Sequence, residues 1–205
     1  MHIISFSDTH RHRIGIPDGD MLIFAGDDDW GTKTSFINFI DYVATFPHKY
    51  KIIIAGNHDF YAECNFAEIY MECAKRGIIY LEDSGIEIEG YNIWGSPYSP
   101  TFNDWAFMKD RGDEISKHWD IIPEDTDILI THGPPMYHLD YCQGGPLGCY
   151  DLNVAVNKIK PKVHIFGHIH NQSGIKETPD TIYINASIVD DYYQECYTPK
   201  EIDIT

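Results

Sequence analysis

The stretch VHIFGHIHN, residues 163–171, contains the pattern that the rest of the chain repeats. A strand-like apolar run, Val163–Phe166, is followed directly by two histidines that are one residue apart. Residues two apart on an extended chain point to the same side. His168 and His170 are therefore expected to reach one common site, unless the stretch is only a polar loop with solvated histidines.

Four further apolar runs resemble Val163–Phe166. They are His2–Phe6, Met21–Ala25, Lys51–Ala55 and Asp127–Ile130. Their apolarity is continuous rather than alternating, which indicates strands that are buried on both faces, as in a sheet covered by helices. The sequence therefore predicts an α/β fold.

Three amphipathic helical patterns lie between these runs, over residues 36–43, 66–73 and 152–159. We expect Ser35, the capping pair Asn65 and Glu68, and Asp151 at their N-terminal ends. A hairpin around Gly90 and further strands over 181–185, 186–189 and 201–204 complete the prediction. No linker or repeat interrupts the chain, so a single domain over residues 1–205 is expected.

Composition narrows the class of protein. The 205 residues are 43% hydrophobic, as in a globular domain, and no apolar run is long enough to cross a bilayer. The chain starts without a basic leader, and its five cysteines form no CxxC pair, so we expect reduced thiols in the cytoplasm. A formal net charge of −17 opposes binding of extended nucleic acid but permits a small phosphate ligand beside cations.

Each of the five runs ends in residues that commonly bind metals. In chain order these are SDTH, AGDDDW, AGNHD, THGPP and GHIH. Any one of them alone is an ordinary turn. In open α/β sheets, however, ligands bind beyond the carboxyl ends of the strands, so five such ends predict one shared site. The candidate ligands are Asp8, His10, Asp27, Asn57, His132, His168 and His170.

The types of these side chains indicate the metal. Carboxylate, imidazole and amide donors without thiolate suit Mn²⁺, Fe or Zn²⁺ better than Cu(I) or an iron–sulfur cluster. Seven donors are too many for one tetrahedral zinc ion, but they fill two sites if one carboxylate bridges. Two-metal sites hold the attacking and departing oxygens of a phosphoryl displacement. For most of the remaining histidines, a surface or packing role is expected.

At these residues the sequence resembles the calcineurin-like metallophosphoesterase superfamily, whose pattern is D-x-H, G-D, G-N-H-[DE], a lone H and G-H-x-H. Residues 105–135 and 160–170 are similar to a small subgroup, the metallophosphoesterase-domain proteins related to vertebrate fetal-brain 239. The resemblance implies a four-layered α/β/β/α sandwich of two mixed sheets. It also implies two divalent metal ions, with Mn²⁺ expected first and Fe, Zn²⁺ or Mg²⁺ as alternatives.

The resemblance also distributes the ligands. It implies that Asp8, His10 and His170 bind one metal, that Asn57, His132 and His168 bind the other, and that Asp27 bridges. A hydroxide between the metals would attack phosphorus. His58 would be the catalytic residue that contacts the phosphate or protonates the leaving oxygen.

The chain departs from the family pattern at one position. Many relatives carry an aspartate three residues after the bridging one, and it orients the catalytic histidine. Here that residue is Trp30. Either Asp28, Asp29 or Asp59 replaces it, or His58 is less well oriented, which would weaken general-acid catalysis but not the metal site.

The leading hypothesis is a phosphoesterase that hydrolyses small-nucleotide phosphodiesters such as cyclic nucleotides. Arg11 and Arg13 are candidates to hold the substrate phosphate beside Asn57 and His58, or they form a solvated pair. GGPLG, residues 144–148, is a candidate lid. Four aromatic residues are candidates to stack on a base, or they only pack: Tyr98, Phe102, Trp105 and Phe107. The alternatives are a nucleotide-binding or scaffold module with little turnover, and a nuclease, which the acidic charge disfavours.

Overall fold

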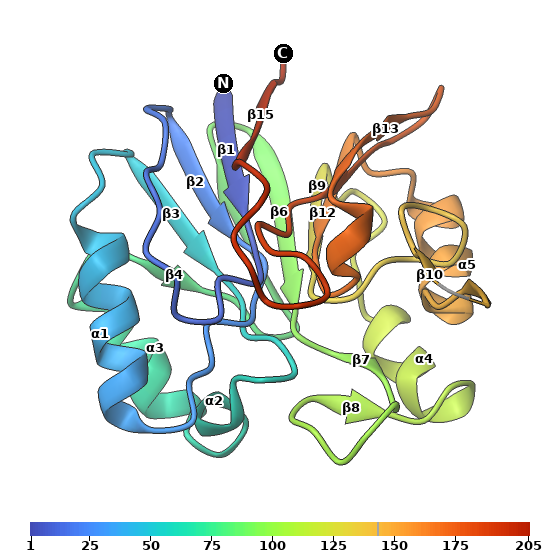
Figure 1. The fold of residues 1–205 in the computed structure, drawn as a ribbon. Helices are drawn as coiled ribbons and strands as arrows, with labels where there is room; N and C mark the ends of the chain where they lie inside the picture. The colour runs from blue at the N-terminus through green and yellow to red at the C-terminus, as the bar shows by residue number, and fades with distance from the viewer. Residues whose placement is uncertain (143) are drawn as a thin grey trace.

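A computed structural model describes residues 1–142 and 144–205 of the chain (Figure 1). Its first large sheet has five strands in the order β15-β1-β2-β3-β4. Their bounds are β1 His2–Phe6, β2 Met21–Phe24, β3 Tyr50–Ile53, β4 Ile79–Tyr80 and β15 Lys200–Asp203. β1 to β4 run parallel, and β15 pairs antiparallel with β1. The parallel strands therefore all end at the same edge.

The second large sheet has six strands in the order β13-β14-β12-β9-β6-β5. Their bounds are β5 Ser84–Ile88, β6 Tyr91–Ser96, β9 Ile128–Thr131, β12 Val163–Phe166, β13 Gly174–Glu177 and β14 Ile182–Asn185. The four inner strands are parallel, and the two outer ones are antiparallel to their neighbours. Both large sheets are therefore mixed, as expected.

Helices cover the outer face of each sheet. They are α1 Lys33–Ala44, α2 Phe60–Cys64, α3 Phe66–Ala74, α4 Asp113–Trp119 and α5 Tyr150–Ile159; a short 3₁₀ helix, η1 His170–Gln172, follows β12 and has no buried residue. In Figure 1, α1 and α3 lie on the side of β2–β4, and α4 and α5 lie on the opposite side of the molecule. The expected α/β/β/α sandwich is confirmed. None of the helices in the described residues is long and apolar enough to cross a membrane.

The alternating direction of the side chains along each strand explains the four layers. Ile3 faces the core between the sheets, whereas Ile4 and Phe6 face the helices of the first sheet. In the second sheet, Ile165 faces the core between the sheets and Phe166 faces α4 and α5. A strand between two apolar layers needs apolar residues on both faces, and this produces the continuous runs in the sequence.

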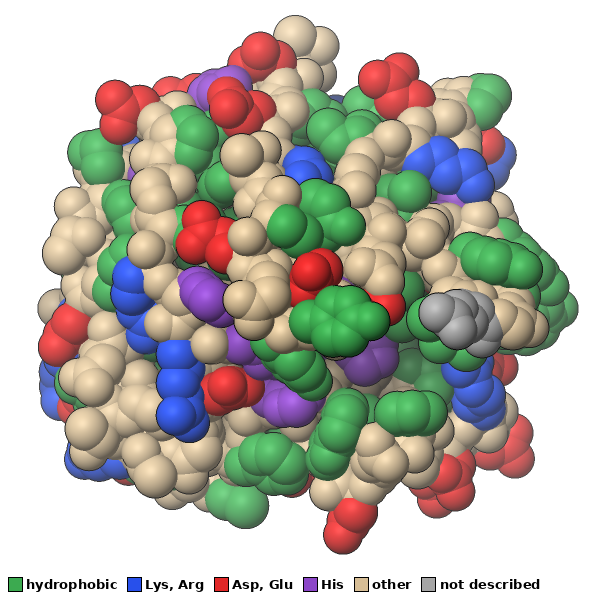
Figure 2. All heavy atoms as spheres, in the orientation of Figure 1, with side chains coloured by type: hydrophobic (Ala, Val, Ile, Leu, Met, Phe, Trp, Pro, Cys, Tyr) green, Lys and Arg blue, Asp and Glu red, His purple; other side chains and the backbone are tan. Residues whose placement is uncertain are grey.

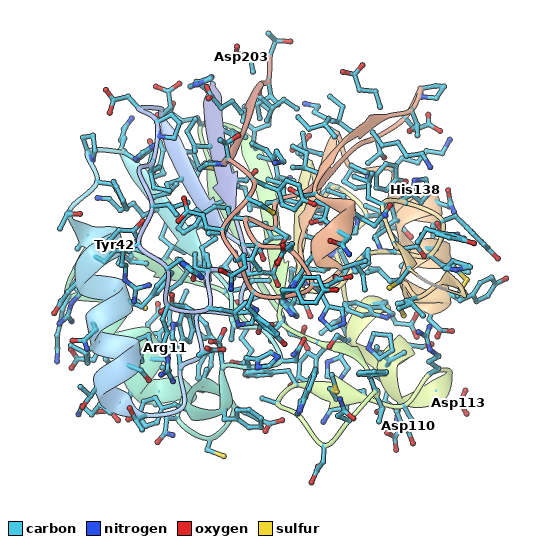
Figure 3. The ribbon with its side chains drawn as sticks, in the orientation of Figure 1. Arg11, Tyr42, Asp110, Asp113, His138 and Asp203 are labelled. Atoms are coloured by element: carbon cyan, nitrogen blue, oxygen red, sulfur yellow. The ribbon has the colours of Figure 1, made fainter. Side chains whose placement is uncertain are left out.

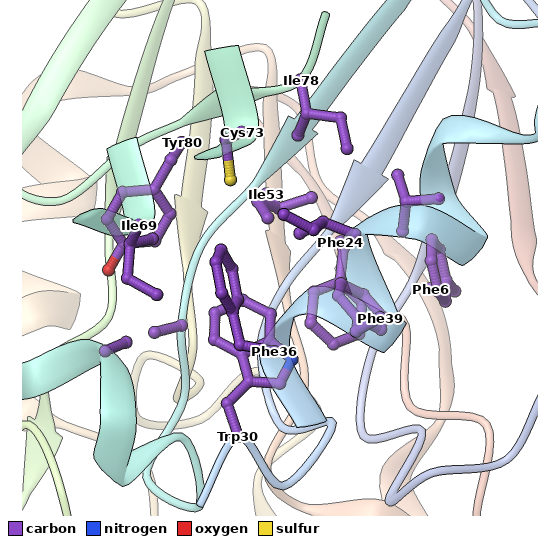
Figure 4. Packing of buried hydrophobic residues seen from close by; sticks show 14 of the residues in the cluster. Phe6, Phe24, Trp30, Phe36, Phe39, Ile53, Ile69, Cys73, Ile78 and Tyr80 are labelled. Carbon is purple, nitrogen blue, oxygen red and sulfur yellow. The ribbon is translucent and has the colours of Figure 1, made fainter. Parts of the chain in front are cut away.

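Trp30 belongs to the helix-side core of the first sheet (Figure 4). Its ring is fully buried, with centroid distances of 5.2 Å to Phe36 and 5.3 Å to Phe39. The position that carries a polar orienting residue in many relatives is thus part of the apolar packing in this chain.

Several predicted helix ends are corrected. Thr32 caps α1, and Ser35 lies inside the first turn as its capping-box partner. The Asn65 side chain caps no N–H of α3, because its amide donates 2.8 Å to the carbonyl of Tyr61 in the preceding helix. Cys149, not Asp151, caps α5.

Residues 186–189 do not form the predicted strand. Ser187 makes an isolated parallel bridge with Ser7, and Val189 makes an isolated antiparallel bridge with Glu195. The segment leaves the second sheet after β14 and runs beside the end of β1. It thereby connects the two sheets at the edge where the parallel strands end.

Two small sheets lie in the long connections. β7 Ser99–Pro100 pairs with β8 Met108–Lys109, and β10 Tyr141–Cys142 pairs with β11 Gly145–Pro146. Their strands are too short to be recognised in the sequence.

Candidate metal centre

The carboxyl ends of β1, β2 and β3 in the first sheet meet those of β9 and β12 in the second. His132, directly after β9, lies against the first sheet, with its Nδ1 2.9 Å from the carbonyl of Ala25. Figure 2 shows histidine side chains gathered near the middle of this face, next to acidic and hydrophobic ones. The five predicted clusters therefore converge at one site.

Three groups of possible metal-binding side chains form there, and two of them consist of predicted ligands. These two are Asp8, His10 and His170, and Asp27, His132 and His168; the third is His10, Asp29 and His58. Within each group the donor atoms lie within 4.8 Å of one another. Asn57 joins the second group, because its Oδ1 is 2.8 Å from Nε2 of His132. All seven predicted side chains thus lie at one site, with Asp27 in the group of His132 and His168. The distribution over two metals, with Asp27 as the bridge, stays a prediction.

The imidazoles are oriented as metal ligands usually are. Nδ1 of His10 is 2.9 Å from a carboxylate oxygen of Asp29, and Nδ1 of His170 is 3.0 Å from the carbonyl of Asp190. Both partners only accept, so each Nδ1 carries the proton and each Nε2 keeps its lone pair. The two Nε2 atoms face each other at 3.4 Å, an arrangement that requires a shared proton or a cation. The donor set therefore fits a metal ion.

Electrostatics support the same conclusion. Burial raises the pKa of Asp27, but the charge and hydrogen bond of His132 outweigh it, and the net pKa lies well below the usual range. Burial lowers the pKa of His132, yet Asp27, 3.2 Å away, raises it overall to about 9. Burial lowers the pKa of His168 to about 4. Without a cation, Asp27 is thus ionised and His168 is neutral, as metal binding requires, whereas His132 carries a proton that a bound cation would displace.

The backbone around these ligands is strained. Left-handed φ values occur at Asp8 (54°), His10 (40°), Asp27 (67°) and His168 (70°). Such values are uncommon for residues other than glycine, and they cluster at functional sites where the fold imposes them. The four residues occupy the first sharp turn after their strands, which aims their side chains at the joint edge.

His58 is not one of the seven predicted ligands, but it forms the third group together with His10 and Asp29. Its ring centroid is 5.0 Å from that of His10, and its Nδ1 is 3.6 Å from the Asp29 carboxylate. Burial lowers the pKa of His58, partly offset by Asp27.

Of the three candidates to replace the missing aspartate, only Asp29 contacts His58. The carboxylate of Asp59 accepts four backbone N–H groups, from Asp27, Asp28, Trp30 and Gly56. The carboxylate of Asp28 accepts hydrogen bonds from Arg13 and Thr9. Both side chains are fully used in holding the loop after β2.

Neither of the two candidate phosphate-binding arginines lines the cavity that opens beside the ligand groups. Arg13 binds Asp28 through both terminal nitrogens and stacks over Tyr42, so its guanidinium is already paired. Arg11 is largely exposed on the loop after β1 (Figure 3), with Nε 3.8 Å from Asp29. The structure does not bring either side chain into contact with Asn57 or His58.

A cavity of about 490 Å³ opens beside the ligand groups. Phe102 and Trp105 line it, whereas Phe107 is buried in the core and Tyr98 stacks on His118. Of residues 144–148, Leu147 and Gly148 line the cavity, and Arg111 donates to the carbonyls of both. That this segment acts as a lid stays a prediction.

Sequence reasoning missed two parts of the site. No sequence motif marks Arg111, because its side chain binds main-chain carbonyls, which every residue type carries. Tyr193 also lines the cavity, but it lies in a stretch without any motif, residues 190–194.

Ionised carboxylates and oriented imidazoles at the joint edge of two sheets define a metal-dependent phosphoesterase centre. Comparison with known proteins gives the family. The model of the calcineurin-like phosphoesterase family matches residues 1–172, and the chain belongs to that family.

Its relatives include the small subgroup that the sequence resembled. Metallophosphoesterase domain-containing protein 1 of Homo sapiens is 36% identical over 228 residues, covering 98% of this chain and 70% of the relative. UPF0046 protein K07C11.7 of Caenorhabditis elegans is 36% identical over 202 residues, covering 91% and 69%. Among solved structures, TT1561 of Thermus thermophilus has the same fold, with a TM-score of 0.58, 13% identity, and coverage of 90% of this chain and 88% of that chain.

Proposed function

We propose that this phosphoesterase uses two divalent cations to hydrolyse small-nucleotide phosphodiesters, with cyclic nucleotides as candidate substrates. The observation that carries the proposal is the pair of ligand groups beside one cavity. Asp8, His10 and His170 would hold one cation. Asn57, His132 and His168 would hold the other, and Asp27 would bridge.

Two bound cations supply positive charge to the phosphoryl oxygens and lower the pKa of a coordinated water. Side chains of the protein would supply the remaining contacts to the phosphate. The amide nitrogen of Asn57 is buried and has no hydrogen-bond partner among the described residues. Because Asn57 also lines the cavity, this nitrogen is available to donate to a phosphate oxygen.

His58 is the proposed general acid. It lines the cavity and lies next to the ligand groups, where a leaving oxygen would depart. Asp29 faces Nδ1 of His58 from 3.6 Å and would keep the ring oriented, so that Nε2 can deliver the proton.

Charge favours a diester over a monoester. Asp27 and Asp191 line the cavity, and among its described residues the one fixed cation is Arg111, which already donates to two carbonyls. The dianion of a monoester would need a further cation to balance its second charge, whereas the monoanion of a diester would not.

Mn²⁺ is the proposed cation, because imidazole, carboxylate and amide donors without thiolate suit it. We also place the protein in the cytoplasm, whose reducing conditions match five unpaired cysteines.

The test is hydrolysis of bis(4-nitrophenyl) phosphate after chelation and after readdition of Mn²⁺. Chelation should abolish activity and Mn²⁺ should restore it. Asp27→Ala should lose activity together with tight binding of a metal pair, because one carboxylate serves two cations. Asp203→Ala, at an exposed carboxylate, is the control. Two tightly bound metals in Asp27→Ala would refute the bridging assignment.

A further inference from the structure

A turn formed by residues 190–194 lies against the ligand groups, although it belongs to none of the motifs and lies beyond the residues that the family model matches. The ring of Tyr193 in this turn lies next to three histidines. Its centroid is 4.5 Å from that of His10, 5.4 Å from that of His170 and 6.4 Å from that of His58. All three ring pairs are close to perpendicular, at 85°, 80° and 76°. Tyr193 thus packs against both the ligands and the proposed acid.

Hydrogen bonds fix this turn to a metal-ligand candidate. The carbonyl of Asp190 accepts from Nδ1 of His170 at 3.0 Å, and its carboxylate accepts the N–H groups of Tyr192 and Gln194. On the other side, Nε2 of His12 is 3.0 Å from the carbonyl of Tyr193. The position of the Tyr193 ring relative to the metal site is therefore set by the same residue that would bind the metal.

The turn holds Tyr193 in an unfavourable backbone conformation. Its φ is 59°, in the left-handed region that bulky side chains rarely adopt. The ring remains 43% exposed and lines the cavity, so burial does not account for its position. Tyr192, its neighbour in the same turn, is 82% exposed and does not line the cavity.

Trp105 provides a second aromatic surface beside His58. Its ring centroid is 4.6 Å from that of His58, and Phe102 extends the surface at 6.0 Å from Trp105. A phosphate held by the ligand groups would carry its substituent into the cavity that Trp105 and Tyr193 both line. Aromatic side chains interact well with a planar ring, and the interaction tolerates different rings because each has a π-face.

We propose that Tyr193 and Trp105 form an aromatic subsite that selects substrates with a planar ring attached close to the phosphorus. This proposal rests on the proposed function for the position of the phosphate. It adds a specificity residue from the turn at residues 190–194.

The experiment compares binding of phenylphosphonate and methylphosphonate to the Mn²⁺-loaded protein by calorimetry. Neither probe has a phosphoester bond, so binding is measured independently of hydrolysis. Phenylphosphonate should bind about tenfold more tightly, the scale of one stacked ring. Tyr193→Leu should remove most of that advantage and leave methylphosphonate binding and metal content unchanged. Tyr193→Phe keeps the ring, and Tyr192→Leu changes only the exposed neighbour, so both should retain the advantage.

Equal affinity for the two probes in the unaltered protein would overturn the proposal. So would a Tyr193→Leu variant that loses metal or weakens both probes equally, because the ring would then only support the ligands. A phenyl advantage that depends on Tyr193, in a protein that hydrolyses no phosphodiester, would refute the proposed function and leave the subsite standing. Failure to bind either phosphonate would overturn the subsite alone, because these probes ionise to dianions whereas the proposed diester substrate is a monoanion; the diester assay decides the proposed function.

Discussion

Single hydrogen bonds determine what the histidines of this centre can do. His10, His132 and His170 each direct Nδ1 to an oxygen that only accepts, so Nε2 is the atom that remains for a cation. Partners of this kind are often nearly as important for metal affinity as the ligands themselves. Asp29 is the most connected of them, because its carboxylate lies near both His10 and His58.

His58→Ala should keep both metals and reduce turnover by a factor on the order of 10²–10⁴, as for a lost general acid. The loss should be largest for alkoxide leaving groups and small for 4-nitrophenolate, which needs no proton. Rates across a leaving-group series, with metal content measured in parallel, check this. Equal losses for all leaving groups would assign His58 to phosphate binding instead.

Asp29→Asn should reproduce the leaving-group dependence in weaker form if Asp29 acts through His58. The double variant with His58→Ala should then be no slower than His58→Ala alone, because interacting residues are not additive. Additive losses accompanied by reduced metal content would show that Asp29 acts through His10.

His164 makes stability depend on pH. Thr131 Oγ donates to the carbonyl of Gly133 and therefore accepts from Nε2 of His164, whose Nδ1 is buried without a partner among the described residues. Burial, with a small contribution from His138, lowers the pKa of His164 to about 3. The unfolded chain binds this proton from about pH 6.5 downward, so between pH 6.5 and 3 the folded state should lose stability as pH falls.

His164→Gln should remove this contribution. Below pH 6.5 the unaltered protein should lose up to about 1.4 kcal/mol of unfolding free energy per pH unit more than the variant. Urea titrations of both proteins at pH 7.5 and 5.5, with chelator present, measure the difference. Identical pH slopes would place His164 in a more polar environment than the structure shows.

At the scale of the elements, the turns after β1, β3 and β12 pack so closely that two glycine positions in them have no room for a side chain. A Cβ on Gly167 would collide with Ser7 and Asp8, and one on Gly56 would collide with Asp27 and His132. Glycine at these two positions lets backbone from one sheet approach the ligands of the other.

Gly167→Ala should therefore displace Asp8 and weaken metal binding by at least tenfold, with a corresponding loss of activity. Gly15→Ala is the matched control, because no atom lies within 4 Å of a Cβ at that position. Metal titrations of both variants test this. Unchanged affinity in Gly167→Ala would mean that the turn after β12 relaxes easily.

The elements that the sequence predicted are those with a local signal. Continuous apolar runs marked β1, β2, β3, β9 and β12, and the polar residues directly after them marked the candidate ligands. The predicted capping role of Asn65 was wrong, because its side-chain amide donates a hydrogen bond to a main-chain carbonyl of α2 instead. Tyr193 and Asp29 owe their positions to contacts between distant segments, and no local pattern records such contacts.

At the scale of the whole molecule, the net charge of the protein affects which substrates can approach the metal centre. The formal net charge is −17, and no basic stripe was found in the sequence. Cations in the centre would attract one phosphate, but the acidic surface around it would repel the other phosphates of a polyanion that come within about 8 Å at physiological salt.

A cyclic nucleotide should therefore be a better substrate than a short DNA or RNA strand. The kcat/KM for the strand should rise with added salt, which screens the repulsion, while that for the cyclic nucleotide should change little. Measurements at low and high salt distinguish the cases. A strand that is cleaved faster at low salt and slows as salt is added would reveal a basic groove and contradict the small-substrate hypothesis.

Both groups of predicted ligands take donors from the two sheets. Asp8 and His10 follow a strand of the first sheet and their partner His170 follows one of the second, while Asp27 of the first sheet meets His132 and His168 of the second. A cation bound at either group would therefore link the first sheet to the second. At a free cation concentration of 100 Kd, one site would add about 2.7 kcal/mol to folding stability. By the same linkage, the apolar packing between the sheets favours the arrangement in which the cations bind.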